Sequence, residues 1–481
     1  MQRKFLSNLS ILLLLNLLVK PFYLLVIEAG VQNELGSAIF GNYSALLSLT
    51  FLLNIFLDMG VNGFTSKTLA SEESSAEKLL SGILGLRLLM GVVYFILLFG
   101  TAILIGYQGD DITLLWYLGI NQLLSGGVLY LRSILAGLME FKKDAIISIM
   151  DRALIVIILI PFILLNIEGL PPLSIQFFIY AQTVGYALTL LVALFFVLRK
   201  TGRIRISWQP TFNRQILKNS FPYALLVLLM MFYYKTDSIM LERMLPEGDY
   251  FAGIYARGFR LFEAGNMIGY LFAVLLLPIF SKSFAMKRAM DSILDHAFRL
   301  MLFGSTIALF CSWFWAETIL NLIYTEDILP SIGPFQVLMT SFFFLMLGHL
   351  WSTLLTAHGS LKSLNMIAIV AVVVNIILNF TLIPEYTALG SAVASLITQA
   401  LAVTLQWLIA MKRTGVRLST RTIRSGLVFV IISGVSAWGL TIIPVNPLLS
   451  MVAFPILAFI IAWLLGIFRY AHLKAILQEK D

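Results

Sequence analysis

The chain has 481 residues, of which 59% are hydrophobic and only 12% are charged, and its mean hydropathy is +0.93. This composition leaves too little polar side chain to cover a water-exposed globule of that length, so it excludes a soluble protein and predicts a membrane protein. The single cysteine, Cys311, excludes a disulfide framework or a thiolate metal site within one chain. The formal net charge of +8 must be interpreted from where the basic residues lie.

Apolar runs recur along the whole sequence, and about fourteen of them reach the roughly 20 residues that a transmembrane helix needs. The first six are 7–27, 40–64, 80–106, 113–138, 145–166 and 173–198, the next six are 220–241, 250–280, 298–323, 334–357, 364–383 and 388–411, and the last two are 422–443 and 448–468. The first run continues through Lys20 and Pro21 to Ile27 without a small-residue cleavage site. It is therefore expected to be a retained span and not a cleaved signal peptide.

A short internal repeat relates the two halves of this layout. Gly41-Asn-Tyr43 opens the second span, and Gly253-Ile-Tyr255 opens the eighth. Because six spans separate the copies, both have the same orientation, as expected for two lobes related by an axis along the membrane normal. We predict an all-α protein with two pseudo-symmetric six-helix lobes, 1–200 and 201–412, followed by two C-terminal transmembrane helices and a cytoplasmic tail, 413–481. The alternative is a chance match of short apolar motifs.

Basic and acidic loop residues are predicted to lie on opposite sides of the membrane. When alternate loops are assigned to opposite sides, the basic clusters 199–218 and 412–424 fall on one side with most of the other Lys and Arg residues. The opposite loops hold Arg243 as their only basic residue, together with the acidic residues Glu34, Asp110, Asp111, Glu168, Glu247, Asp249, Glu326, Asp327 and Glu385. Under the positive-inside rule, both chain ends are then cytoplasmic.

Charged residues inside the spans indicate where function lies, because each costs about 2.5–3.5 kcal/mol to insert and usually faces a cavity or a partner. The basic ones are Lys20, Arg87, Arg152, Lys235, Arg257 and Arg260, and the acidic ones are Asp58, Asp151, Asp237 and Glu263. Lys20 and Lys235 lie mid-span at corresponding places of the two halves, and Pro21 favours a bend after Lys20. The excess of cations predicts an anion-binding site, since guanidinium groups bind phosphate oxygens and ammonium groups add positive charge.

Several of these basic and acidic residues have a structural alternative. Arg257 and Arg260 share a helical face with Glu263, because the three recur every third residue, and this face is not expected to contact lipid. Arg87 and Asp58, in contrast, lie close enough to the cytoplasmic boundary to reach water.

The acidic and aromatic residues leave more than one role open. Asp237, Glu263 and Asp58 are expected to be counter-ions of the bases or proton or sodium sites, and Asp151 and Arg152 point in different directions on their helix. The tyrosines beside the basic residues could stack on sugar faces, although aromatic belts and core packing explain most membrane tyrosines. These tyrosines are Tyr23, Tyr234 and Tyr255.

Enzyme chemistry is not indicated. The sequence contains no Gly-x-x-x-x-Gly-Lys-Ser/Thr segment, its four histidines lack metal-ligand spacing, and its loops leave no room for an extramembrane catalytic domain. We therefore expect a transporter with no catalytic residues, no cofactor, no metal and no nucleic-acid partner.

Two longer stretches have the order and spacing of a known family. The first runs from Thr236-Asp-Ser-Ile-Met-Leu241 through Gly253-Ile-Tyr-Ala-Arg-Gly-Phe-Arg-Leu261 to Leu277-Pro-Ile-Phe-Ser281. The second places Asn375 and Asn379 before Leu382-Ile-Pro-Glu-Tyr386 and Gly390-Ser-Ala-Val-Ala394. With the fourteen-span layout, they resemble the polysaccharide transporter and O-antigen flippase family of the multidrug/oligosaccharidyl-lipid/polysaccharide flippase superfamily over most of the chain.

This resemblance implies two lobes around a central cavity. It implies alternating-access transfer of an undecaprenyl-diphosphate-linked oligosaccharide (an O-antigen, capsule or exopolysaccharide repeat unit) across the cytoplasmic (inner) membrane of a bacterium. The six span cations would bind the diphosphate, and 422–468 would form a groove for the polyprenyl tail. Lys20 stands where related lipid II flippases have an arginine, so it adds a point charge without a bidentate contact. Expected partners are the lipid-linked oligosaccharide, membrane lipid, H⁺ or Na⁺, and a polysaccharide polymerase.

Three rival functions follow from the same sequence. A drug/cation antiporter of this superfamily would need an acidic cavity, which the cationic excess disfavours. A lipid II flippase differs mainly in the glycan that it accepts, and the sequence does not exclude it. A non-transporting scaffold would have little use for charges at mid-membrane depth in both halves.

Overall fold

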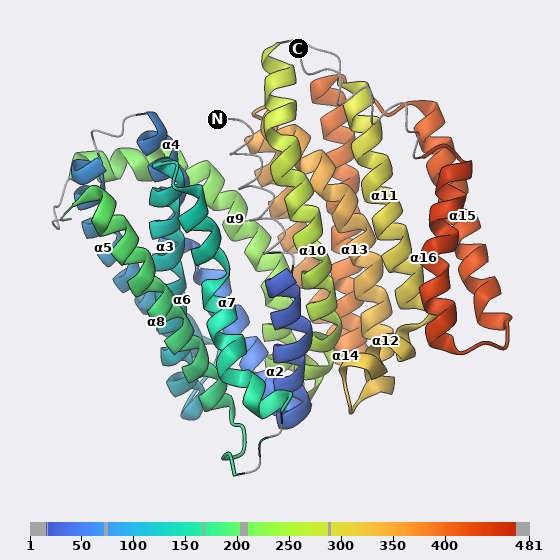
Figure 1. The fold of residues 1–481 in the computed structure, drawn as a ribbon, viewed down its shortest axis with the longest axis horizontal. Coiled ribbons are helices and arrows are strands. Elements are labelled where there is room, and N and C mark those ends of the chain that lie inside the picture. The colour runs from blue at the N-terminus through green and yellow to red at the C-terminus, as the bar shows by residue number, and fades with distance from the viewer. Residues whose placement is uncertain are drawn as a thin grey trace. The chain divides into compact units, whose positions relative to one another are not determined.

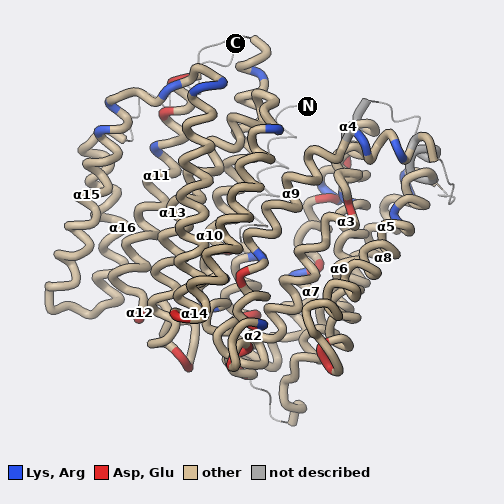
Figure 2. The backbone as a smooth tube through the Cα atoms, turned by 180° about the vertical axis from the view of Figure 1, so that it is seen from behind, with Lys and Arg blue, Asp and Glu red and all other residues tan. Residues whose placement is uncertain are grey.

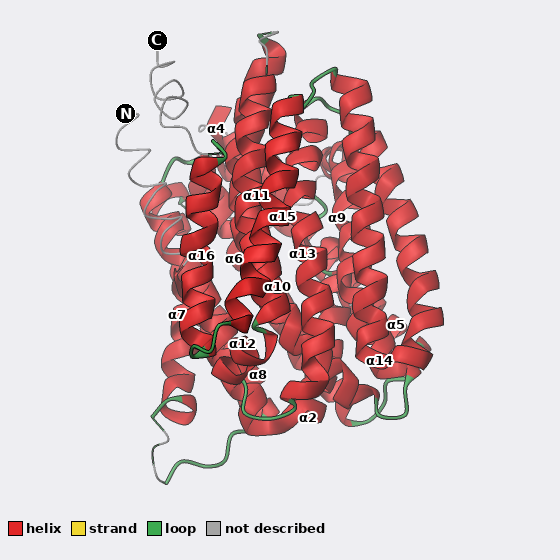
Figure 3. Cartoon of the chain, turned by 90° about the vertical axis from the view of Figure 1, so that its right-hand side faces the viewer, coloured by secondary structure: helices red, strands yellow, loops and turns green. Residues whose placement is uncertain are grey.

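The computed structural model describes residues 16, 18–71, 76–165, 167, 169–202, 210–286 and 290–467. Within these residues every regular element is a helix and no strand occurs (Figure 3). The predicted all-α membrane fold is therefore confirmed. Glu168, the beginning of the first predicted span and the chain end after residue 467 lie outside the described residues.

The helices follow one another with short connections (Figure 1). The first nine elements are the π-helix η1 (Tyr23–Glu28), α2 (Ala29–Leu53), α3 (Ile55–Asp58), α4 (Val61–Ser71), α5 (Ala76–Leu104), α6 (Asp110–Gly137), α7 (Phe141–Ile163), α8 (Ile175–Thr201) and α9 (Pro210–Met244). The remaining ones are α10 (Gly248–Ala285), α11 (Asp291–Phe314), α12 (Ala316–Ile323), α13 (Ile328–Ala357), α14 (Leu361–Thr414), α15 (Thr420–Ile442) and α16 (Pro447–Leu464).

Twelve helical segments of the described chain are long and apolar enough to cross a bilayer. Two of them, Leu18–Ser66 with 49 residues and Leu361–Thr414 with 54, are about twice the roughly 20 residues that one crossing needs. A residue with non-helical backbone angles lies between two predicted spans in each, Gly36 (φ 82°) in the first and Thr387 (φ 51°) in the second. Each segment thus provides two crossings, which gives the fourteen predicted spans.

The Cα positions group into two compact units. Unit 1 comprises Met1–Ala256 and Ile376–Ala388, and unit 2 comprises Arg257–Asn375 and Leu389–Asp481. The three boundaries fall inside helices, one in α10 and two in α14. The predicted lobe boundaries at residues 200 and 412 stay a prediction, and each unit is described separately below.

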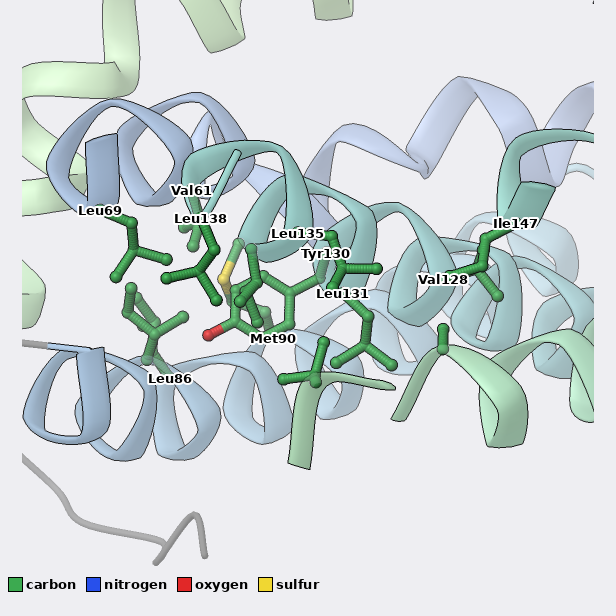
Figure 4. Close-up of a cluster of buried hydrophobic side chains, with 14 of the residues drawn as sticks. Val61, Leu69, Leu86, Met90, Val128, Tyr130, Leu131, Leu135, Leu138 and Ile147 are labelled. Carbon is green, nitrogen blue, oxygen red and sulfur yellow. The ribbon is translucent and has the colours of Figure 1, made fainter. Parts of the chain in front are cut away.

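Unit 1 is built around α6, which packs on α8, α4 and α2, while α2 also packs along α9. A buried cluster joins α4, α5 and α6 and includes Leu69, Leu86, Met90, Leu131 and Leu135 (Figure 4). Lipid is as apolar as these side chains, so close van der Waals packing holds the helices together.

In unit 2, α11 packs on α13 and α15, and α15 packs on α16. The Phe314 ring of α11 and the Phe454 ring of α16 pack on Trp315, whose indole N–H donates to the Ser450 hydroxyl at 2.9 Å. Glycines on α15 allow the close approach to α11, since a Cβ on Gly426 or Gly434 would lie 2.8 Å from Leu302 or 2.9 Å from Phe310. The last two spans are therefore docked on unit 2 by small residues facing large ones.

The two Gly-x-Tyr motifs meet in unit 1. A Cβ on Gly41 of α2 would lie 1.8 Å from the Asp249 carbonyl oxygen of α10, and one on Gly253 would lie 2.0 Å from the Ser37 carbonyl oxygen of α2. Each motif glycine thus touches the residue four positions before the other motif glycine. This reciprocity is the contact pattern of a two-fold axis, and it gives the predicted repeat a physical role.

Basic and acidic residues lie at different ends of the helices. In unit 2, Lys and Arg residues gather at the end where α15 begins, and the end near α12 carries acidic residues (Figure 2). In unit 1, a guanidinium nitrogen of Arg243 lies 3.5 Å from a carboxylate oxygen of Asp111. The loop assignment had placed these two residues on the same side, and the structure brings them together. Which end faces the cytoplasm stays a prediction.

Candidate functional site

Three basic side chains come together within the spanning helices of unit 1. Lys20 lies in the helical turn before η1, Arg132 lies on α6 and Arg152 lies on α7. We call these three residues the cationic cluster. Arg132 and Arg152 act on the charge of Lys20 more strongly than the acidic residues Asp151 and Asp144 do. Like charges therefore concentrate where charges are costly.

The three members have different partners. The Arg132 guanidinium forms an ion pair of 2.6 Å with Asp144. Arg152 donates to the hydroxyl of Tyr186, and its guanidinium carbon lies 4.7 Å from the Tyr23 ring centroid. Among the described residues, neither Lys20 nor Arg152 has a carboxylate oxygen within 4.0 Å of a side-chain nitrogen. The cluster therefore contains two cations that no described acidic group neutralises directly.

A π-helix adjoins the cluster. η1 begins two residues after Pro21, where the sequence predicts a bend, and it holds Tyr23 against Arg152. π-helical turns are rare and occur often at functional sites. The amide of Gln182 on α8 donates to the hydroxyls of Tyr23 (3.3 Å) and Tyr43 (2.8 Å), which fixes both rings.

Asp58 and Arg87 form a separate pair. Their ion pair measures 3.1 Å, and Asp58 also accepts from the backbone N–H groups of Gly60 and Asn62 at the start of α4. Arg87 additionally donates to Asn62 and to the Gly126 carbonyl, and its guanidinium carbon lies 4.2 Å from the Tyr130 ring centroid. These contacts agree with the structural alternative for the pair.

Asp237 on α9 is the most deeply buried acidic residue of the predicted site, with 1% of its surface exposed. It accepts from the Tyr255 hydroxyl at 2.8 Å and from the Asn379 amide at 2.7 Å. Lys235, two residues earlier, lies 5.2 Å from the Phe51 ring centroid, and Tyr234 packs on its neighbour Tyr233 with ring centroids 4.1 Å apart.

In unit 2, Arg257 and Arg260 share one partner. The Tyr324 hydroxyl accepts from Arg260 at 3.2 Å and donates to the Arg257 carbonyl at 3.3 Å. Arg257 forms an ion pair of 3.2 Å with Asp327 and also donates to the backbone carbonyl of Glu326. Both arginines are almost fully buried, so neither side chain faces lipid. Glu263, one turn further along α10, is half-buried.

A further cluster joins the two repeat halves inside unit 1. Arg243, at the end of α9, contacts Glu242 (2.6 Å) and Asp111 (3.5 Å), and its guanidinium carbon lies 3.7 Å from the Tyr107 ring centroid. The Tyr107 hydroxyl donates to Glu242 at 2.8 Å, and burial followed by the charge of Glu242 raises the pKa of this phenol, so it stays protonated. Asn42, the middle residue of the first Gly-x-Tyr motif, donates to Asp111 at 3.0 Å.

Sequence reasoning missed Arg132, Gln182 and the Arg243 cluster. Arg132 stood inside a predicted span and could have been found by the rule applied to the other charges. Gln182 gave no such signal, because neutral amides are tolerated in apolar helices. The part of the chain that the structure describes contains no group of three or more His, Cys, Asp and Glu residues that could hold a metal ion.

Comparison with known proteins adds a family and a fold. The family model described as polysaccharide biosynthesis protein matches residues 5–284. An uncharacterized membrane protein of Methanocaldococcus jannaschii is 25% identical over 371 residues, which cover 76% of this chain and 88% of that protein.

Two groups of solved structures share the fold. The lipid II flippase MurJ, in an inward closed conformation, superposes with a TM-score of 0.73 at 16% identity, covering 94% of this chain and 97% of that one. An inward-facing multidrug resistance MATE family transporter of the MOP superfamily gives a TM-score of 0.66 at 14% identity, covering 82% and 94%. At these identities the likeness concerns the fold alone.

Proposed function

Since the chain belongs to the polysaccharide biosynthesis protein family and has the fold of MOP superfamily transporters, we propose that it is a flippase for lipid-linked oligosaccharides. Its substrate is an oligosaccharide on undecaprenyl diphosphate, such as an O-antigen, capsule or exopolysaccharide repeat unit. The supporting observation is the pair Lys20 and Arg152, two cations at membrane depth with no carboxylate within 4.0 Å among the described residues.

The physical reasoning starts from the cost of those charges. An uncompensated cation inside a membrane protein is costly, so it is retained where a ligand supplies the opposite charge. A diphosphate has several anionic oxygens and forms strong charge-assisted hydrogen bonds with arginine, while a lysine adds a movable point charge. The glycan cannot cross hydrocarbon by itself, and its polyprenyl tail can remain in lipid.

Lys235, Arg257, Arg260 and Arg87 complete the proposed set of diphosphate contacts at other stages of the cycle, although each is engaged with the protein in this conformation. Asp237 is the proposed coupling residue for H⁺ or Na⁺, because it is buried and held by two neutral donors. Glu263 and Asp58 are proposed as counter-ions. The tyrosines Tyr23, Tyr234 and Tyr255 would meet sugar only after they leave the contacts described above.

The Arg243 cluster supports alternating access. It ties the 107–111 segment and α2 to the end of α9 at the end of unit 1 assigned to the non-cytoplasmic side. Release of these few polar contacts would let that end open. In the proposed orientation both chain ends are cytoplasmic, the membrane is the inner membrane of a bacterium, and the product passes to a polysaccharide polymerase.

Reconstitution in vesicles tests the proposal. Purified protein should move a fluorescent undecaprenyl-diphosphate oligosaccharide between leaflets. It should transport a cationic dye little or not at all. Selective transport of the dye would favour the drug/cation antiporter and contradict the flippase. A comparison of O-antigen carriers with lipid II would separate the proposed substrate from the lipid II alternative.

A further inference from the structure

A groove lies at one end of unit 2, between the beginning of α15 and the end of α16. It encloses about 410 Å³, within the range of about 300–1,000 Å³ that is usual for ligand sites. Two arginines, two hydroxyl groups and two apolar side chains line it: Arg421, Arg424, Thr420, Ser425, Val428 and Leu465. This lining suits a ligand that is anionic at one end and apolar at the other.

The groove is preformed, because polar contacts fix both of its walls. Arg299 of α11 donates to the Thr422 hydroxyl of α15 at 2.7 Å and to the Gly466 carbonyl just after α16 at 3.4 Å. The Ser419 hydroxyl accepts from the Thr422 N–H and so caps α15. The Asp295 carboxylate accepts from the Ser419 N–H at 3.0 Å, which anchors the cap to α11.

The two groove arginines have no acidic partner among the described residues. Both are exposed, and both lie near the beginning of α15, where the partial positive charge of the helix end disfavours cations. The positive-inside rule accounts for basic residues on this side of the membrane but not for their position at the beginning of a helix. Lys412 and Arg413 satisfy the same rule from the last turn of α14, where the helix dipole favours cations. An anion in the groove would offset both arginines and the helix end.

An apolar stripe continues from the groove into the span. Val428, Ile431 and Val435 follow Arg424 at helical spacing on α15, with 41%, 64% and 61% of their surfaces exposed. Leu464 of α16, next to Leu465 in the groove, is 78% exposed. Acyl chains could lie along this stripe while the head group stays between the arginines.

We propose that this groove binds the head group of an anionic membrane phospholipid, such as phosphatidylglycerol, as a bound lipid that is distinct from the transported substrate. The phosphate lies between Arg421 and Arg424, and the hydroxyl of Thr420 donates to one of its oxygens. The inference does not depend on the proposed function, because it rests on unit 2 alone.

Native mass spectrometry of the purified full chain tests the inference. With phosphatidylglycerol and phosphatidylcholine supplied together, the wild type should retain the anionic lipid about tenfold or more in preference, since each surface Lys or Arg adds about 1 kcal/mol toward anionic lipid. The R421Q/R424Q variant should lose this preference. The matched control K412Q/R413Q removes the same charge at the same side but outside the groove, and it should keep the preference.

A second variant separates the groove from charge alone. Leu465→Trp fills the groove without changing charge, and it should also lose the retained lipid while its thermal midpoint without added lipid stays at the wild-type value. The proposal would be overturned if R421Q/R424Q and K412Q/R413Q lost the lipid preference equally. It would also be overturned if both R421Q/R424Q and Leu465→Trp kept the bound lipid. Preferential retention of undecaprenyl phosphate over phosphatidylglycerol would overturn it as well, because the groove would then belong to the substrate.

Discussion

Two sets of cations within the spanning helices, one in each unit, differ in how the protein compensates them. In unit 2, Arg257 forms an ion pair with Asp327 and donates to the Glu326 carbonyl, and Arg260 donates to the Tyr324 hydroxyl. In unit 1, Arg152 contacts Tyr23 and Tyr186, and neither Arg152 nor Lys20 has a carboxylate oxygen within 4.0 Å of a side-chain nitrogen among the described residues. Both sets look alike in the sequence, as charges in apolar runs. Only the partners distinguish a cation that holds the fold from one that awaits a ligand.

The comparison predicts opposite consequences of mutation. Removing a compensated cation should lower stability, because its partner is left buried without a counter-charge. Removing an uncompensated cation should leave stability nearly unchanged and abolish ligand binding. Stability and transport therefore have to be measured on the same variants.

The largest effect on transport is expected for K20A/R152A. Each charge-assisted hydrogen bond to the diphosphate contributes about 1.5–3 kcal/mol, so the double variant should flip substrate more than a hundredfold more slowly, as estimated from two such bonds. Its thermal midpoint should stay within a few degrees of wild type. A leaflet-accessibility assay in vesicles and a melting curve in detergent measure the two quantities.

The control for this variant is Lys142→Ala, which removes an exposed cation from the beginning of α7. It should leave both transport and stability unchanged. If K20A/R152A transports normally, or melts far below wild type, the distinction drawn between the two sets of cations fails.

The next largest effect is expected for Arg257→Ala. Loss of one partner from a buried ion pair costs about 3–5 kcal/mol, and the value should lie near the lower limit because Asp327 is about one quarter exposed. Unfolding in denaturant should show this loss, whereas Arg413→Ala, an exposed cation on α14, should show none. Unchanged stability of Arg257→Ala would mean that Asp327 and Glu326 do not hold this arginine.

A smaller effect is expected at the contact between the repeat motifs. Gly253→Ala would bring a Cβ to 2.0 Å from the Ser37 carbonyl oxygen, so α2 and α10 must separate, and overpacking of this kind costs about 1–3 kcal/mol. Gly100→Ala on α5 is the matched control, because nothing lies within 4 Å of the added Cβ. Equal melting temperatures for the two variants would contradict the close approach.

Hydropathy was sufficient to predict the fold class, because a polytopic helical fold follows from apolar runs of the required length. The breaks at Gly36 and Thr387 were also implied, since each falls between two predicted spans. The division of compact units inside α10 and α14 was not predictable, because it depends on contacts between residues far apart in the chain.

The candidate site was predicted only as a set of charges. Periodicity placed Arg257 and Arg260 on one face, and Tyr324 contacts both, but nothing in the sequence paired them with the 324–331 segment. The pairing of Asp58 with Arg87 likewise depends on the approach of α3 to α5. A single sequence reveals the cost of a buried charge, whereas the compensating partner comes from tertiary structure.

The most direct test of the central claim measures binding of undecaprenyl diphosphate and of the uncharged alcohol undecaprenol to the purified protein. The wild type should prefer the diphosphate, and K20A/R152A should bind both lipids equally while remaining folded. If the double variant keeps the wild-type preference for the diphosphate, Lys20 and Arg152 do not provide the anion site.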